Sequence, residues 1–139
     1  MPGSNSSPAA SFGLLLLRVG AGGMLAVNHG WTKLMHFSQL APKWADPLHI
    51  GHDRSLMLTI FAEVGCAALV ALGFATRFAA AILVFMFGMI VLVVLRGHPF
   101  SDRELAIVYA LPFLCLVFTG GGGYALDANY GPKVKFGGK

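Results

Sequence analysis

Two charged residues stand inside apolar runs, and their type and position make them the first candidates for chemistry. Arg18 interrupts the run from Phe12 to Val27, and Glu63 is the only charge between Leu56 and Phe74. Because an unpaired charge near the middle of a membrane costs several kcal/mol on most estimates, we expect these two residues to pair. Two interpretations of the pair stay open: it locks two helices together, or it lines a cavity where it orients a polar ligand group or handles protons.

A second candidate group follows the first apolar run. His29 and Lys33 are four residues apart, with Gly30 between them, and share one face if the helix continues. A histidine and a lysine in this position could bind a quinone oxygen or an anionic substrate. The alternative is that Lys33 extends to lipid phosphate while His29 packs at the interface. The residues predicted to line a ligand or quinone cavity are therefore Arg18, His29, Lys33 and Glu63.

The other residues with reactive side chains give weaker signals. His49 and His52 have a spacing that permits two metal ligands, with His36 or Asp46 as a third, but two such histidines in a polar loop are more often solvated. No metal site is predicted, and His49 and His52 remain weak candidates. Cys66 and Cys115 are each ten residues from the same end of their runs, so a thiol pair is geometrically feasible. A thiol in lipid stays protonated, which favours simple packing.

A glycine tract from Gly120 to Gly123 ends the last apolar run and gives the backbone abundant freedom. Tyr124 can anchor at the interface. Asp127 can accept hydrogen bonds from freed backbone donors or pair with Arg77. The simplest alternative is that the tract only ends the helix. The residues expected to form this structural motif are Arg77, Gly121, Gly123, Tyr124 and Asp127.

Composition indicates the medium in which these residues work. Of 139 residues, 56% are hydrophobic and only 12% are charged, and the mean hydropathy is +0.71. Soluble domains are about 25% charged, so lipid is the expected solvent. The net charge of +4 comes from basic residues scattered without a run or stripe, which favours contact with lipid phosphates and argues against nucleic acid.

Four apolar runs are each long enough to cross a bilayer of roughly 30 Å as a helix. They cover Phe12–Val27, Leu56–Phe74, Phe78–Leu95 and Leu105–Gly123. A membrane β-barrel is excluded because its strands alternate apolar and polar residues, whereas these runs are apolar on every side. The predicted fold is an all-α integral membrane four-helix bundle with up-down topology. The connection Asn28–Arg54, with Trp31 and Trp44, is predicted to lie along the interface between helices one and two.

The domain organisation follows from these runs. Residues 1–11 are predicted to be a flexible tail, residues 12–127 the transmembrane domain, and residues 128–139 a basic C-terminal tail. Alternating helix direction places all five histidines on one side of the membrane: His29, His36, His49, His52 and His98. The basic residues do not decide the orientation, because four (Arg77, Lys133, Lys135, Lys139) stand against five (Lys33, Lys43, Arg54, Arg96, Arg103).

Four short motifs, in this order, resemble the DoxX family of small four-helix membrane proteins. They are Leu17-Arg18-Val-Gly20, His29-Gly30-Trp-Thr-Lys33-Leu34, Glu63 with Leu72-Gly73-Phe-Ala-Thr76-Arg77, and Gly121-Gly-Gly123-Tyr124-Ala-Leu126-Asp127. The similarity runs over about residues 12–127. The sequence departs from the family pattern at Ala125, where Ser is frequent, and in the histidine-rich loop.

The resemblance implies a membrane subunit of a quinone-linked oxidoreductase that handles thiosulfate, thiols or quinones. The alternative is a non-catalytic scaffold, assembly or accessory subunit of a larger membrane complex, and a transporter is a third interpretation. The chain has no dinucleotide fingerprint, haem-attachment motif or iron-sulfur cysteine set. We therefore expect no covalently bound cofactor, a mobile quinone as ligand, and other membrane subunits or copies of the chain as partners. The family resemblance and the basic tail favour the inner membrane of a prokaryote with both termini in the cytoplasm.

Overall fold

The first helix of the computed structural model, which describes residues 7–128, is longer than its apolar run. It comprises α1 (Pro8–Met24), the π-helix η2 (Leu25–Trp31) and α2 (Thr32–Met35), 28 residues without a break. It begins at Pro8 because the Ser7 hydroxyl accepts a hydrogen bond from the Ala10 N–H at 3.1 Å and proline suits the first helical position. Residues 8–11 are thus helical, and Asn28–Met35, expected in the connection, extends the helix.

The connection to the second helix is correspondingly short. It contains α3 (Phe37–Leu40), the 3-10 turn η3 (Ala41–Lys43) and a loop that ends at Gly51. Asp46 organises this loop, because its carboxylate accepts hydrogen bonds from the Ser55 hydroxyl at 2.7 Å and from the N–H groups of Ile50 and Gly51 at 2.9 and 2.8 Å. These hydrogen bonds hold the pKa of Asp46 below its ordinary value, and the bond from Ser55 contributes most.

Three further helical rods complete the described chain. The second comprises α4 (His52–Ile60), the π-helix η4 (Phe61–Cys66) and α5 (Ala67–Leu72); the third comprises α6 (Thr76–Met89) and the π-helix η5 (Ile90–Val94). The fourth is α7 (Phe100–Thr119), followed by the turn η6 (Leu126–Ala128). The second and fourth rods end at glycines with positive φ, 80° at Gly73 and 71° at Gly120, conformations that glycine adopts without strain.

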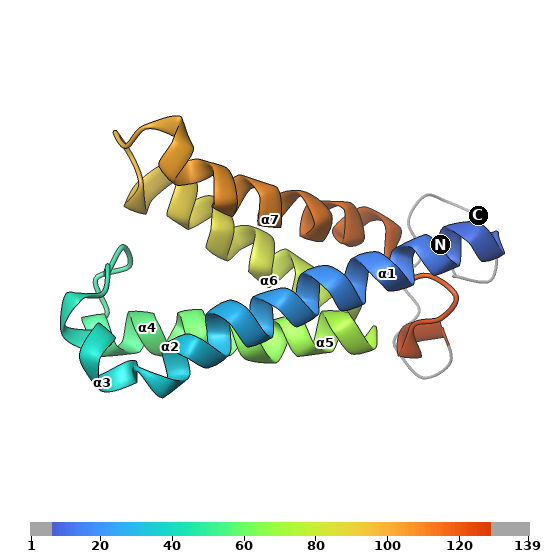
Figure 1. The fold of residues 1–139 in the computed structure, drawn as a ribbon, viewed down its shortest axis with the longest axis horizontal. Coiled ribbons are helices and arrows are strands. Elements are labelled where there is room, and N and C mark those ends of the chain that lie inside the picture. The colour runs from blue at the N-terminus through green and yellow to red at the C-terminus, as the bar shows by residue number, and fades with distance from the viewer. Residues whose placement is uncertain (1–6, 129–139) are drawn as a thin grey trace.

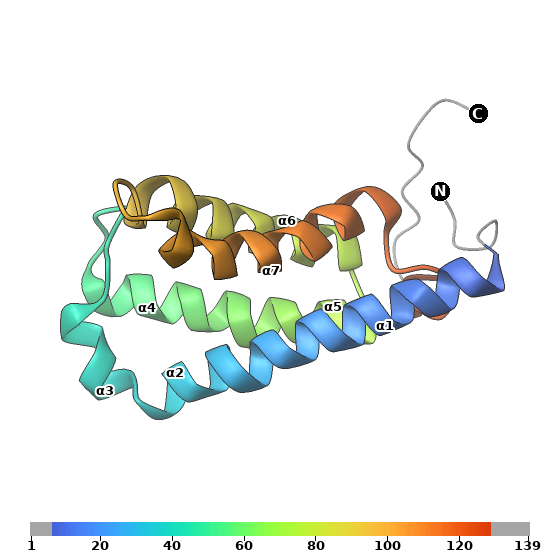
Figure 2. The same cartoon turned by 45° about the horizontal axis from the view of Figure 1, so that its top comes forward.

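Neighbouring rods run antiparallel and pack in pairs, as Figures 1 and 2 show. Helix α6 lies along α7, and α1 lies along α5, while α5 also contacts α6. Figure 2 shows the α6–α7 pair stacked over the α4–α5 rod, with α1 crossing on the other side. Their shared core consists of Leu25, Ala67, Val70, Leu83, Phe113 and Leu116, all fully or almost fully buried.

Three of these helices have the length and composition to cross a membrane: Pro8–Met35, His52–Leu72 and Thr76–Val94. The described residues contain no strand. The first turn of α7 carries Asp102, Arg103 and Glu104. Many large apolar side chains face outward, among them Phe78 at 69% exposed and Phe118 at 74%. A helical chain with this much exposed apolar surface is a multi-pass membrane protein.

Candidate functional site: a buried ion pair between the first two helices

The most distinctive polar contact inside the bundle joins the first helix to the second. The Lys33 ammonium lies 2.8 and 3.1 Å from the two carboxylate oxygens of Glu63. The Glu63 side chain is 4% exposed and that of Lys33 is 18% exposed. Solvent or a ligand would therefore reach the pair from the side of the lysine. The Lys33 ammonium also lies 5.8 Å from the centre of the Trp44 ring, within the range of a cation–π contact.

Aromatic rings continue the site toward α7. The ring of His29 meets the ring of Tyr109 edge to face at a centroid distance of 5.3 Å. Tyr109 stacks on Phe87 at 5.7 Å, and Phe87 stacks on Phe113 at 6.2 Å. His29 precedes Lys33 by one turn of the same helix. Lys33, Glu63, His29 and Tyr109 form what we call the polar cluster, which holds a cation, a carboxylate, an imidazole and a phenol.

The backbone around this cluster is unusual, because two π-helical segments pack against each other there. Glu63 belongs to η4 and His29 to η2, and these segments are in direct contact. Gly30 makes the approach close: a Cβ there would lie 2.6 Å from Cγ2 of Val64 and 2.9 Å from the carbonyl carbon of Glu63. π-helical turns are rare and are frequent at functional sites. The wider π-helical turns and the missing side chain at Gly30 together bring the two helices near enough for the Lys33 ammonium to reach the Glu63 carboxylate.

Arg18 does not belong to this cluster, and the predicted Arg18–Glu63 pair is wrong. The Arg18 guanidinium donates from Nε to the Gly121 carbonyl at 3.0 Å and from Nη1 to the carbonyls of Ala71 and Val70 at 2.8 and 3.4 Å. Glu63 lies opposite Gly30, which is twelve residues beyond Arg18, or about 18 Å along the helix. The prediction failed because it ended the first helix at Asn28 and therefore misjudged the depth of Arg18.

Arg18 instead fastens the glycine tract to the far end of the bundle. The Gly123 N–H donates to the Ser11 hydroxyl at 3.2 Å, and the Arg77 guanidinium lies beside Gly120. Tyr124 is 57% exposed. The tract that follows α7 thus folds back over α1 and the start of α6.

Asp127 completes this arrangement. Its carboxylate accepts hydrogen bonds from the N–H groups of Ala75 and Thr76 at 2.7 and 2.8 Å, and its own N–H donates to the Gly73 carbonyl at 2.9 Å. Asp127 thus accepts backbone hydrogen bonds, and the donors belong to the start of α6 rather than to the glycine tract. A carboxylate is well placed there, because the first N–H groups of α6 have no partner within the helix. The tail predicted for residues 128–139 lies, apart from Ala128, outside the described residues.

The weaker candidates do not join the cluster. Cys66 is buried and Cys115 is exposed, and both are free thiols, so the feasible thiol pair is not formed. Nδ1 of His52 contacts the Trp44 carbonyl, and His49 stands in the loop with a φ of 57°. Within residues 7–128, no three side chains of the metal-binding types gather in one place.

Comparison with known proteins gives the chain a family. The DoxX family model matches residues 13–96, which is more than half of the sequence. The chain belongs to the DoxX family. No curated protein and no solved structure matches it. The matched part of this DoxX protein contains Arg18, His29, Lys33 and Glu63, whereas Tyr109 and the Gly121–Asp127 motif lie beyond it.

Sequence reasoning missed two features of this site. It placed Lys33 among the cavity residues but paired Glu63 with Arg18, although the spacing of three residues between Gly30 and Lys33 places both on one helical face that can turn toward Glu63. It also passed over Tyr109, which lies inside the fourth run. The phenol group of a tyrosine within an apolar run needs a polar partner. In this DoxX protein the cluster therefore draws on three helical rods rather than two.

Proposed function

We propose that this DoxX protein is the membrane subunit of a quinone-linked oxidoreductase and that the polar cluster is where it meets the quinone head group. The observation that carries the proposal is the pair between Lys33 of α2 and Glu63 of η4, with the Glu63 side chain 4% exposed, beside the contact between η2 and η4. A buried ion pair is weak evidence for stability, because apolar residues of similar volume often stabilise as well or better. Ionisable residues inside membrane helices more often mark a functional site.

The chemistry of the cluster supports this role. Reduction of a quinone to a quinol takes up two electrons and two protons, and the reverse reaction releases them. Lys33 offers protons and hydrogen bonds to a quinone oxygen, Glu63 accepts protons, and His29 and Tyr109 extend the array toward α7. The sequence has no motif for an electron carrier of its own. In this proposal the electrons therefore come from a substrate held by a partner subunit, such as thiosulfate or a thiol.

The proposal also states how many times the chain crosses the membrane and on which side its termini lie. Helix α7, which runs antiparallel along α6, is the fourth crossing of an up-down four-helix bundle, with its charged first turn at head-group depth. The termini then share one side of the membrane, which we assign to the cytoplasm of a prokaryote, and the polar cluster lies nearer the opposite side. A second copy of the chain or another membrane subunit would cover part of the exposed apolar surface.

Quinone binding to the purified protein tests this assignment. We expect a short-chain ubiquinone analogue to quench Trp44 fluorescence saturably, because Trp44 lies beside Lys33. Glu63→Gln should weaken this binding at least tenfold, since the amide cannot hold Lys33 in place as a carboxylate does. Glu104→Gln, at an exposed position of α7, is the matched control and should leave binding unchanged.

Two results would contradict the assignment. One is the absence of saturable quenching in the wild-type protein. The other is equal affinity in wild type, Glu63→Gln and Glu104→Gln, which would place any quinone site elsewhere. Thermal unfolding of each variant, recorded in the same detergent, separates loss of binding from loss of folding.

A second candidate function is that of a scaffold or assembly subunit, and one feature of the third helix, α6 with η5, favours it. Phe78, Phe85 and Leu92 recur every seven residues and are 69%, 62% and 71% exposed, forming an outward apolar stripe. Phe87 does not belong to this stripe, because it is 4% exposed and stacks in the core. Recovery of the protein in fixed proportion within a larger complex, with no quinone bound, would favour this second function.

A further inference from the structure

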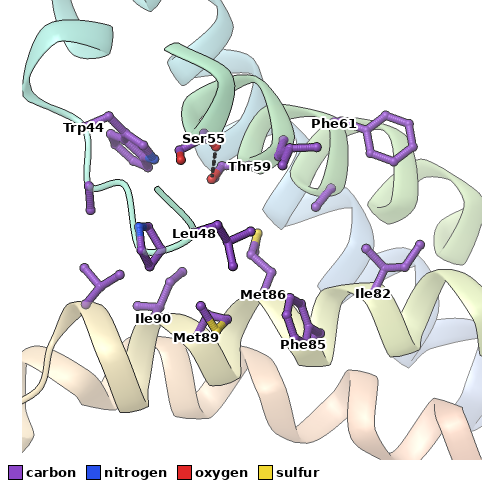
Figure 3. Close-up of a pocket in the computed structure, with 15 residues that line it drawn as sticks. Trp44, Leu48, Ser55, Thr59, Phe61, Ile82, Phe85, Met86, Met89 and Ile90 are labelled. Atoms are coloured by element: carbon purple, nitrogen blue, oxygen red, sulfur yellow. Dashed lines mark hydrogen bonds between the residues drawn. The ribbon is translucent and has the colours of Figure 1, made fainter. Parts of the chain in front are cut away.

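An apolar groove separates the second rod from the third on the outer surface of the bundle. It has a volume of about 290 Å³ and lies between α4–η4 and α6–η5, as Figure 3 shows. Phe61 and Ile82 line one end, and Trp44 and Leu48 of the connecting loop line the other, with Met86 and Ile90 along the α6 side. The groove borders the polar cluster but does not include its four residues: Ala62 faces the groove, its neighbour Glu63 faces Lys33, and Trp44 lies beside both.

The position of the groove relates it to the membrane. Its long walls come from the helices His52–Leu72 and Thr76–Val94, both of which have the length and composition to cross a bilayer. Its loop end lies where these two helices begin and end, the depth at which a tryptophan such as Trp44 is favoured. The groove therefore runs from the interface into the hydrocarbon layer.

The hydroxyl groups of the groove are already used within the protein. Ser55 Oγ donates to Asp46, and Thr59 Oγ1 donates to the Ser55 carbonyl at 3.0 Å. They offer no free donor to a ligand inside the groove, whose remaining lining is aliphatic, aromatic or methionine. Methionine side chains adapt to irregular apolar shapes. These features fit a flexible hydrocarbon chain rather than a polar ring.

Three cations are close sequence neighbours of residues that line the groove. Lys43 precedes Trp44, Arg54 precedes Ser55, and Arg96 follows Val94 by two residues; all three are exposed. Of the nearby acids, Asp46 is bound to the loop backbone and Ser55, and Asp53 stands next to Arg54. The positive excess is complementary to a lipid phosphate with a net negative charge. We propose that the groove binds one acyl chain of an anionic phospholipid whose phosphate lies between Lys43, Arg54 and Arg96.

Trp44 provides a direct reporter of this binding, which does not depend on the proposed quinone function. The chain has two tryptophans, so Trp31→Phe leaves Trp44 alone in the wall of the groove. Lipids with brominated acyl chains quench a tryptophan that they touch. In bilayers of phosphatidylcholine, brominated phosphatidylglycerol should reach half of its maximal quenching at a mole fraction several-fold lower than brominated phosphatidylcholine does.

Variants in the Trp31→Phe background assign the effect to the groove. Thr59→Phe fills it and should abolish the preference for phosphatidylglycerol, whereas Val108→Phe, on the exposed surface of α7, should retain it. Ile82→Phe fills the groove from the opposite wall and serves if Thr59→Phe fails to fold. Replacing Lys43, Arg54 and Arg96 by Gln should reduce the preference while chain contact persists.

Two outcomes would overturn the proposal. Quenching that follows the average lipid composition equally for both lipids would show that Trp44 meets only bulk lipid. A preference that survives both Thr59→Phe and Ile82→Phe in folded protein would place the selective lipid outside the groove.

Discussion

Lys33 and Glu63 bring opposite charges together inside the bundle, 2.8 Å apart. Lys33→Met would leave the Glu63 carboxylate buried without a partner, which typically costs ~3–5 kcal/mol. We expect a matching loss in the free energy of unfolding, measured in detergent. Lys43→Met, at an exposed position, should change it by less than about 0.5 kcal/mol.

A double variant distinguishes a pair kept for stability from one kept for function. Lys33→Met with Glu63→Leu removes both charges and fills the space with apolar atoms, so stability should return to the wild-type level or exceed it. Quinone binding should remain lost in this variant. If the double variant is instead as unstable as Lys33→Met alone, the loss lies in packing and not in an unpaired charge.

At the scale of elements, the contact between η2 and η4 sets the distance between the first two helices. Gly30→Ala places a methyl group 2.6 Å from Val64 Cγ2 and close to the Glu63 backbone, so the helices must separate. We expect a lower unfolding temperature and weaker quinone binding.

Gly23→Ala provides the matched control in the same helix. A Cβ at Gly23 meets no atom within 4 Å, and alanine favours a helix over glycine by ~1 kcal/mol. The unfolding temperature should therefore rise or stay constant. Equal effects of the two substitutions would show that helix propensity, and not the close approach at Gly30, governs this part of the bundle.

At the scale of the whole molecule, the two ends of α7 report whether it crosses the membrane. In a background of Cys66→Ala and Cys115→Ser, His98→Cys and Tyr124→Cys place single thiols at exposed positions before and after α7. A membrane-impermeant maleimide should label them from opposite sides, and Phe74→Cys should label from the same side as Tyr124→Cys. Labelling of His98→Cys and Tyr124→Cys from one side would show that α7 does not span the bilayer.

The sequence by itself determined the membrane-spanning character and the DoxX membership of this protein. Long apolar runs have only one stable form in hydrocarbon, a helix that satisfies its own backbone, so composition alone decides that much. The sequence also indicated that Asp127 accepts backbone hydrogen bonds, but not that the donors are Ala75 and Thr76 at the start of α6.

Only the tertiary structure decided which charges meet. The partner of Glu63 depends on where the first helix ends and on how it is placed along the second, and a shift of a few residues changes the facing side chain. The π-helical turns and the approach at Gly30 set that placement, and neither has a clear mark in the sequence. Arg18 donates to backbone carbonyls at one end of the bundle, and Lys33 turns inward to Glu63 toward the other. A buried polar group needs a partner of suitable geometry, which is not always the nearest opposite charge in the sequence.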